Sequence, residues 1–202
     1  MIEEYVAARG ITLLLHFTQV CNLDSILQRG ILPRNMLIGE DGVRFNDQYR
    51  FDGTDAVCLS ISYPNYKMFF RLRQESPDAE WVVLAVRPRA LWMLPCAFCA
   101  TNAASATITA IPLAQRRTLA ALQGLYADWG GKNRAVLAIP DNYPTNPQAE
   151  VLMLEGVPRD YILGVIVPNI PLKNRLLARY PGLAVKHVPQ YFGPRHDYIH
   201  WR

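Results

Sequence analysis

Short apolar runs constrain the fold of this chain most. The two longest, residues 11–15 and 81–86, have the length of buried strands and are too short to cross a bilayer. Alternation near the first run places Leu14 and His16 on one face of a strand. Because polar segments rich in glycine and proline separate such runs, the sequence predicts a sheet of short strands.

Helical patterns lie between the strands without regular alternation. We expect strands over 11–17, 56–61, 81–87, 150–154, 161–167 and 184–188. We expect helices over 66–74, over 112–126, and from an Asn22 N-cap to Gly30. The segments expected to be irregular are 37–53, 95–110 and 127–147. This mixture predicts the α+β class, with a split or mainly antiparallel sheet flanked by helices, in a single domain over residues 1–202.

Composition limits the classes of protein to which this chain can belong. Half of the residues are hydrophobic, which excludes a disordered chain, and a net charge of +4 permits nucleic-acid contact without requiring it. The opening residues 1–4 lack the basic region of a signal peptide, so we expect a cytoplasmic protein with reduced cysteines and no membrane partner. Cys96 and Cys99 form a single C-x-x-C with no second ligand pair, so no metal site is expected.

Glu150 is the most informative single residue. It begins an apolar run of strand length and follows a long polar loop, a placement typical of catalytic groups. A glutamate that keeps a strand edge soluble explains the same pattern, and composition alone favours that interpretation. Gln148 stands two residues earlier and projects the same way if the strand begins early.

Further polar residues complete a candidate site. His16 ends an apolar strand, where a core histidine with a satisfied hydrogen bond is the simpler interpretation. Arg50 stands on a tight turn, where a guanidinium can hold a diphosphate, although surface arginines usually serve solubility. Lys67, Arg71 and Arg73 are spaced to share one helical face, which is either a phosphate track or a solvated surface.

Common catalytic motifs are absent. The sequence contains no G-x-G-x-x-G, no P-loop, no H-E-x-x-H and no G-x-S-x-G. The residues alone therefore predict an enzyme-like α+β domain with a candidate site of His16, Arg50 and Glu150.

A family resemblance extends this prediction. Segments 15–18 (LHFT) and 22–33 resemble the opening of ADP-ribosyltransferase-fold proteins, including DarT toxins and, more loosely, RNA 2′-phosphotransferases. More specific segments resemble the DarT family in the same order: 50–53, 59–69 (LSISYPNYKMF), 98–104 and 147–152 (PQAEVL). The match spans about residues 13–167 and is closer to the guanine-modifying branch than to the thymine-modifying branch.

The resemblance implies roles for individual residues. It implies that Glu150 and Arg50 are catalytic, with Arg44 as the alternative arginine. The residues implied to bind NAD⁺ are His16, Thr18, Asn22, Arg50, Ser60, Tyr66 and Met68. The residues implied to contact DNA are Lys67, Arg71, Arg73, Asn102 and Gln148.

The resemblance also implies a reaction and partners. The chain is expected to move ADP-ribose from NAD⁺ onto a base of single-stranded DNA, guanine before thymine, without a metal. It is expected to be the toxin of a toxin–antitoxin pair, opposed by an ADP-ribosyl-removing antitoxin of macrodomain or NADAR type. An RNA 2′-phosphotransferase, a protein-modifying toxin and a non-catalytic nucleic-acid-binding module remain alternatives, since a fold alone does not name the acceptor.

Overall fold

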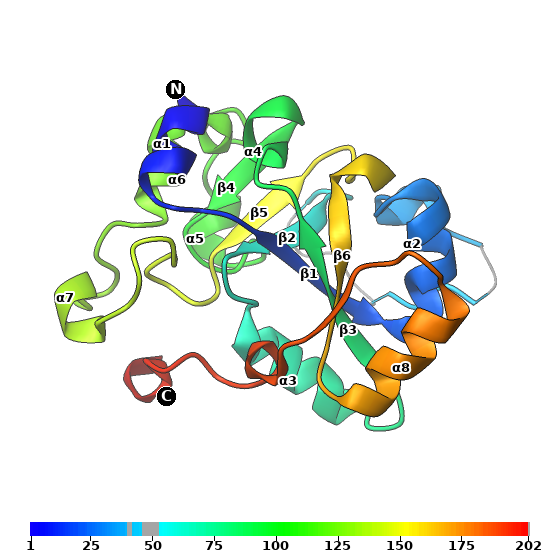
Figure 1. Ribbon diagram of the computed structural model, residues 1–202. Coiled ribbons are helices and arrows are strands. Elements are labelled where there is room, and N and C mark those ends of the chain that lie inside the picture. Colours follow the sequence, from blue (N-terminus) through cyan, green and yellow to red (C-terminus); the bar gives the residue numbers. More distant parts are fainter. Residues whose placement is uncertain (40–41, 46–52, 202) are drawn as a thin grey trace.

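One sheet organises the part of the chain that the structure describes. The structure is a computed structural model that describes residues 1–39, 42–45 and 53–201. The strands of these residues are β1 (Leu14–Gln19), β2 (Val57–Ile61), β3 (Trp81–Val86), β4 (Cys96–Cys99), β5 (Glu150–Met153), β6 (Ile162–Val167) and β7 (Val185–His187). They form a sheet in the order β4-β5-β2-β1-β3-β6-β7, in which only β6 and β7 are parallel (Figure 1). The predicted α+β class with a mainly antiparallel sheet is confirmed.

The sheet is split between β1 and β2. β1 pairs with β3 along all six of its residues, but it pairs with β2 only at Leu14 and Leu15. Beyond Leu15 the two strands diverge, which leaves a crevice between the halves of the sheet. The predicted split sheet is therefore also confirmed.

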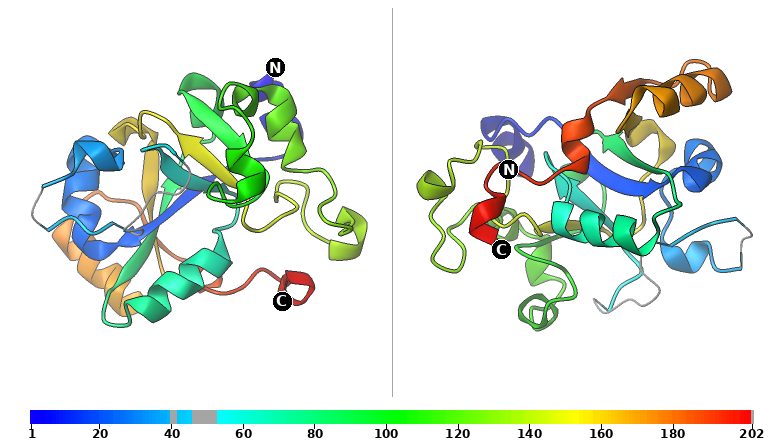
Figure 2. Two further views of the ribbon diagram at one scale, coloured as in Figure 1. Left: turned by 180° about the vertical axis from the view of Figure 1, so that it is seen from behind. Right: turned by 90° about the horizontal axis from the view of Figure 1, so that it is seen from below.

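Helices flank the sheet. They are α1 (Ile2–Ala8), α2 (Leu23–Arg29), α3 (Tyr66–Glu75), α4 (Ala90–Met93), α5 (Ala106–Thr109), α6 (Leu119–Gly124), α7 (Arg134–Leu137) and α8 (Ile170–Arg179). Alternation along the strands sends Leu14 and Leu84 to the core under α2, α4 and α8, and sends Leu15 and Val83 to the core under α3. Figures 1 and 2 show α3 on one side of the sheet, with α2 and α8 grouped away from it.

Gly30 shows why the segment after α2 must bend where it does. Its φ is +88°, and a side chain there would meet the carbonyl of Val157. Only glycine accommodates both constraints, so the predicted end of this helix is confirmed. The predicted N-cap is confirmed in position only, since the Asn22 side chain makes no capping hydrogen bond.

Several local expectations were wrong. The predicted helix over 112–126 is α-helical only in α6, because Thr118 adopts an extended conformation and caps a new helix through the Ala121 amide. Two of the segments expected to be irregular contain regular elements: 95–110 contains β4 and α5, and 127–147 contains α7. Helices α1 and α8 were not expected, although Asn169 caps α8 and Pro171 occupies its first turn.

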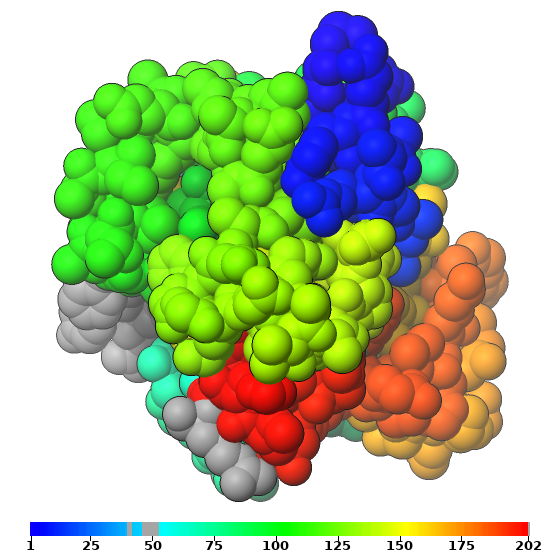
Figure 3. Space-filling view, turned by 90° about the vertical axis from the view of Figure 1, so that its left-hand side faces the viewer, coloured from blue at the N-terminus to red at the C-terminus, as the bar shows by residue number. Residues whose placement is uncertain are grey.

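The last residues cross back over the molecule. After β7 the chain runs past α3 and ends beside the loop that precedes β5 (Figure 1). The space-filling view shows the C-terminal residues, in red, packed against the yellow-green residues of that loop (Figure 3). We name residues 189–201 the C-terminal strap.

Candidate active site

A pocket lies in the crevice where β1 and β2 diverge. Glu150 lies at this pocket, and residues 15–18 of β1 and 57–60 of β2 line its walls. It gathers most residues predicted to bind NAD⁺: His16, Thr18, Asn22, Ser60 and Met68. Apolar side chains that the sequence did not single out complete the lining, including Ile26, Ile31, Leu37, Val43 and Phe45.

The Glu150 carboxylate is buried and held on both oxygens. The residue is 4% exposed. Oε2 accepts a 2.7 Å hydrogen bond from the main-chain amide of Ala103, and Oε1 accepts a longer one, 3.5 Å, from Nδ2 of Asn65. Two hydrogen bonds, one to each oxygen, fix the orientation of the carboxyl group. Glu150 is therefore a pre-oriented carboxylate rather than a solvated strand edge.

Asn65 connects Glu150 to the end of β2. Its amide N–H donates to Oγ of Ser60 at 2.9 Å, and its Oδ1 caps α3 by accepting from the Met68 amide at 3.2 Å. The residue is 1% exposed. The Pro64-Asn65 pair before a helical pattern was a recognisable N-cap signal, but the contact with Glu150 depends on tertiary structure and was missed.

His16 presents a neutral imidazole to the pocket. Its Nδ1 lies 2.9 Å from the carbonyl oxygen of Cys58, which only accepts, so Nδ1 carries the proton of this bond. Burial lowers the pKa of His16 below its ordinary value, and the hydrogen bond to Cys58 opposes this only in part. The other ring nitrogen, Nε2, is then an acceptor suited to a ligand hydroxyl.

Asn22 anchors the segment around Arg44. Its Nδ2 donates to Oγ1 of Thr18 at 2.9 Å and to the carbonyl of Arg44 at 2.8 Å, while Oδ1 accepts from the Arg44 amide at 2.9 Å. The side chain therefore fixes the backbone of residue 44 at the pocket, and most of its hydrogen-bonding capacity is used in doing so.

Two predicted cofactor-binding residues, Arg50 and Tyr66, are not among the described residues that line the pocket. Arg50, the predicted essential arginine, lies outside the described residues, whereas Arg44 lines the pocket. Tyr66 is buried and is not among the lining residues, and its hydroxyl has no hydrogen-bond partner within the described part of the chain.

The predicted DNA-contacting residues lie on α3 and in two loops. On α3, Arg71 is exposed and pairs with Glu75 at 3.5 Å, while Lys67 and Arg73 donate to the carbonyls of Trp201 and Phe192. The expectation that the three cations share one face was wrong, because residues two apart on a helix are separated by about 200°.

Asn102 and Gln148 are close in sequence to residues of the Glu150 site: Asn102 precedes Ala103, and Gln148 lies two residues before Glu150. The side chain of Asn102 accepts from the Ala104 amide at 2.9 Å, immediately after the residue that holds Glu150. The main-chain amide of Gln148 donates to Oδ1 of Asn146 at 2.9 Å, in the loop that leads into β5.

The described residues form neither a cluster of metal ligands nor a membrane-spanning helix. Over residues 1–39, 42–45 and 53–201, no group of three or more histidine, cysteine or acidic side chains is arranged to hold a metal ion. Within the same residues, no helix combines the length and hydropathy that a membrane span requires.

A family model matches nearly the whole chain. Residues 15–199 match the model described as "ssDNA thymidine ADP-ribosyltransferase, DarT". The chain belongs to the DarT family. The predicted family and its enzyme class, NAD⁺-dependent ADP-ribosyltransferases of single-stranded DNA, are confirmed, and the RNA 2′-phosphotransferase alternative is disfavoured. Among curated proteins, none matches the sequence significantly.

Solved DarT structures share the fold. The DarTG of Thermosipho africanus in complex with ADP-ribose is similar with a TM-score of 0.61 and 18% identity, over 90% of this chain and 51% of that one. The DarT of Thermus sp. 2.9 in complex with carba-NAD⁺ has a TM-score of 0.61 and 16% identity, over 90% of this chain and 98% of that one. Its complex with ADP-ribosylated ssDNA has a TM-score of 0.56 and 16% identity, over 91% and 97%. The predicted ADP-ribosyltransferase fold is thus confirmed, and this chain spans about half of the Thermosipho protein.

Proposed function

We propose that this chain transfers ADP-ribose from NAD⁺ to a guanine base in single-stranded DNA. The observation that carries the proposal is the Glu150 carboxylate, fixed by Ala103 and Asn65 at the pocket between β1 and β2. The DarT-family match supports the donor and the acceptor polymer. The Thermus DarT complexes with carba-NAD⁺ and with ADP-ribosylated ssDNA agree with both.

The residues of the pocket suit the donor. The ribose C1′–nicotinamide bond breaks with its electron pair leaving on nicotinamide, and the ribose carbon gains oxocarbenium character. A fixed carboxylate at Glu150 holds a ribose hydroxyl and stabilises the developing positive charge. Neutral His16 accepts a second ribose hydrogen bond through Nε2, and an arginine, Arg50 or Arg44, holds the diphosphate.

The acceptor step follows from the same carboxylate. A guanine amine nitrogen attacks C1′, and the proton that it loses goes to Glu150. The base must leave the stack to reach C1′, which explains a single-stranded substrate. Segments 63–69 and 102–104, which resemble the guanine-modifying branch, motivate the choice of guanine.

Thymine is the second candidate base. The family model that matches this chain carries thymidine in its description. Mass spectrometry of matched oligonucleotides that lack either guanine or thymine, incubated with NAD⁺, separates the two. Labelling that requires guanine supports the proposal, and labelling that requires thymine overturns the choice of base. Labelling of RNA or protein alone overturns DNA as the acceptor.

A toxin–antitoxin role follows from the family resemblance. We propose that the chain acts in the cytoplasm as a toxin, and that an ADP-ribosyl-removing partner of macrodomain or NADAR type reverses its product. The test is removal of the label from the modified oligonucleotide by purified proteins of each type, with the unmodified strand recovered intact. A label that resists both types argues against this partner class.

A further inference from the structure

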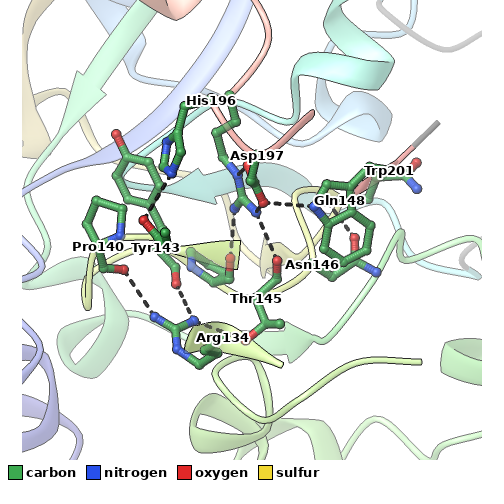
Figure 4. A network of polar contacts seen from close by, with 12 residues as sticks. Arg134, Pro140, Tyr143, Thr145, Asn146, Gln148, His196, Asp197 and Trp201 are labelled. Atoms are coloured by element: carbon green, nitrogen blue, oxygen red, sulfur yellow. Dashed lines mark hydrogen bonds and ion pairs between the residues drawn. The ribbon is translucent and has the colours of Figure 1, made fainter. Parts of the chain in front are cut away.

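A buried ion pair in the C-terminal strap holds the loop that leads into Glu150. Arg195 is 2% exposed, and its guanidinium binds the carboxylate of Asp197 through two nitrogens, at 2.7 and 2.5 Å. The same guanidinium donates to the main-chain carbonyls of Pro144 (2.7 Å) and Thr145 (2.9 Å). Trp201 Nε1 donates a further hydrogen bond of 2.8 Å to Asp197 (Figure 4). A guanidinium this deeply buried is tolerated because each of its three nitrogens donates a hydrogen bond.

The loop of residues 138–149 is held from its other side as well. Arg134 donates to the carbonyls of Tyr143 and Pro140 and to Oγ1 of Thr145, at 2.8 to 3.1 Å (Figure 4). The Thr145 amide donates to the carbonyl of Leu125 at 2.9 Å. The loop is therefore fixed between two guanidinium groups five to ten residues before Glu150.

The order imposed at Thr145 continues to Glu150. Asn146 is 3% exposed and accepts from the Gln148 amide through Oδ1 and from the Ala149 amide through its carbonyl, at 2.9 and 3.0 Å. These turns connect Thr145 to the first residue of β5 without a free segment. The backbone of the half-buried Gln148, two residues before Glu150, is thus held in a fixed place.

The strap is also attached to α3 and to Tyr63, which precedes α3. Tyr63 Oη donates to the carbonyl of Gln190 at 2.5 Å, and Arg73 donates to that of Phe192 at 2.6 Å. Lys67 donates to the carbonyl of Trp201. Asn65, which contacts Glu150, lies between these anchors in sequence. One segment therefore bridges the two elements that flank Glu150.

We infer that the C-terminal strap is a positioning element for the acceptor side of the active site. Through Arg195 and Asp197 it holds the 138–149 loop so that Gln148 meets the incoming base while Glu150 acts on the donor. Apart from Met68 of α3 and Glu150 of β5, the residues that line the donor pocket come from β1, β2, α2 and the segments around Arg34 and Arg44, and the strap contacts none of these through the bonds described above. Loss of the pair is therefore expected to impair use of DNA more than binding of NAD⁺. This inference rests on the proposed function.

The test uses the double variant Arg195→Met/Asp197→Asn. It removes the donors to Pro144 and Thr145. Because both members of the ion pair are neutralised, no lone buried charge remains, whereas either single variant would leave one. Arg195→Lys is the conservative companion, since it keeps the charge and loses the planar fork. The control is Arg175→Met/Glu80→Gln, which removes an exposed Arg–Glu pair between α8 and the residue before β3.

Two measurements are made on the full chain. Hydrogen exchange is expected to rise over 140–149 in the double variant and to stay unchanged in β6 and α8. Calorimetry is expected to give an NAD⁺ affinity within about 3-fold of wild type, while kcat/KM for a single-stranded oligonucleotide falls about 10²-fold, the cost of a small misplacement, with a raised KM. For Arg195→Lys, both the exchange over 140–149 and kcat/KM for the oligonucleotide are expected to lie between those of wild type and the double variant.

Each outcome decides the inference. Equal losses in NAD⁺ affinity and DNA transfer, an unchanged KM for DNA, or unchanged exchange over 140–149 would overturn it. If wild type modifies no oligonucleotide, the proposed function fails instead, and the exchange result decides alone whether the strap orders the loop.

Discussion

The main-chain amide of Ala103 donates a 2.7 Å hydrogen bond to Oε2 of Glu150. Ala103 follows β4, and Cys99 of that strand pairs directly with Glu150 in β5. The strand pairing therefore brings the amide to the carboxylate, and the hydrogen bond fixes the orientation of that carboxylate. This arrangement underlies the first prediction.

Glu150→Gln should retain the fold and lose transfer activity. The glutamine carbonyl still accepts from Ala103, but a neutral amide stabilises the oxocarbenium ion poorly and accepts no proton, so we expect a loss of about 10²-fold or more in kcat. Oligonucleotide labelling and a thermal melt measure the two properties. Glu155→Gln, at an exposed glutamate of the turn after β5, is the control. Near-normal turnover of Glu150→Gln would remove Glu150 from the mechanism.

Arg50→Ala should weaken NAD⁺ use more than Arg44→Ala. The expectation for Arg50 comes from the family resemblance and the tight turn in its sequence, and a charge-assisted hydrogen bond to a diphosphate is worth roughly 1.5–3 kcal/mol, or about 10- to 100-fold in affinity. In Arg44→Ala, the main-chain bonds with Asn22 survive. Calorimetric titration with NAD⁺ compares the two variants. A larger loss in Arg44→Ala would assign the diphosphate to the arginine that lines the pocket.

Asn22→Ala should weaken NAD⁺ binding without unfolding the chain. The change removes both hydrogen bonds to the backbone of Arg44 and the one to Thr18, at about 1 kcal/mol each, so we expect affinity to fall roughly 10-fold or more. Asn142→Ala, which removes a half-buried asparagine side chain away from the pocket, serves as the comparison. Equal affinities of Asn22→Ala and wild type would show that the anchor at residue 44 is dispensable.

Stability should fall as the pH drops below 6.5, and His16 should account for part of the loss. Burial holds the pKa of His16 below its ordinary value of 6.5, so the unfolded chain binds the proton more readily than the folded chain. The contribution of neutral His16 is complete above pH 6.5 and is lost as the pH falls toward the lowered pKa. Urea unfolding of wild type and His16→Gln from about pH 8 to about pH 5 measures the difference. Identical pH profiles would place His16 in a solvated environment.

The described strands other than β4, together with His16 and Glu150 as candidate site residues, followed from local patterns. Alternation in residues 14–17 and the apolar run at 81–86 predicted β1 and β3, because a buried strand needs apolar side chains at period two or on both faces. His16 and Glu150 stood out because a polar group at the end of such a strand must be either satisfied or functional. The family resemblance then gave roles to the residues that the pocket gathers.

Tertiary structure alone decided the rest. β4 is a strand because β5 pairs with it and both of its faces are buried, although its sequence, Cys-Ala-Phe-Cys, carries no alternation of polar and apolar residues. Arg195 and Asp197 have the sequence of a solvated surface, and their burial depends on carbonyls about 50 residues away. Periodicity reports which face a residue takes within its own element, because that is fixed by local backbone geometry. The partner that a buried charge or carboxylate finds is fixed only when distant segments pack, and no local pattern encodes it.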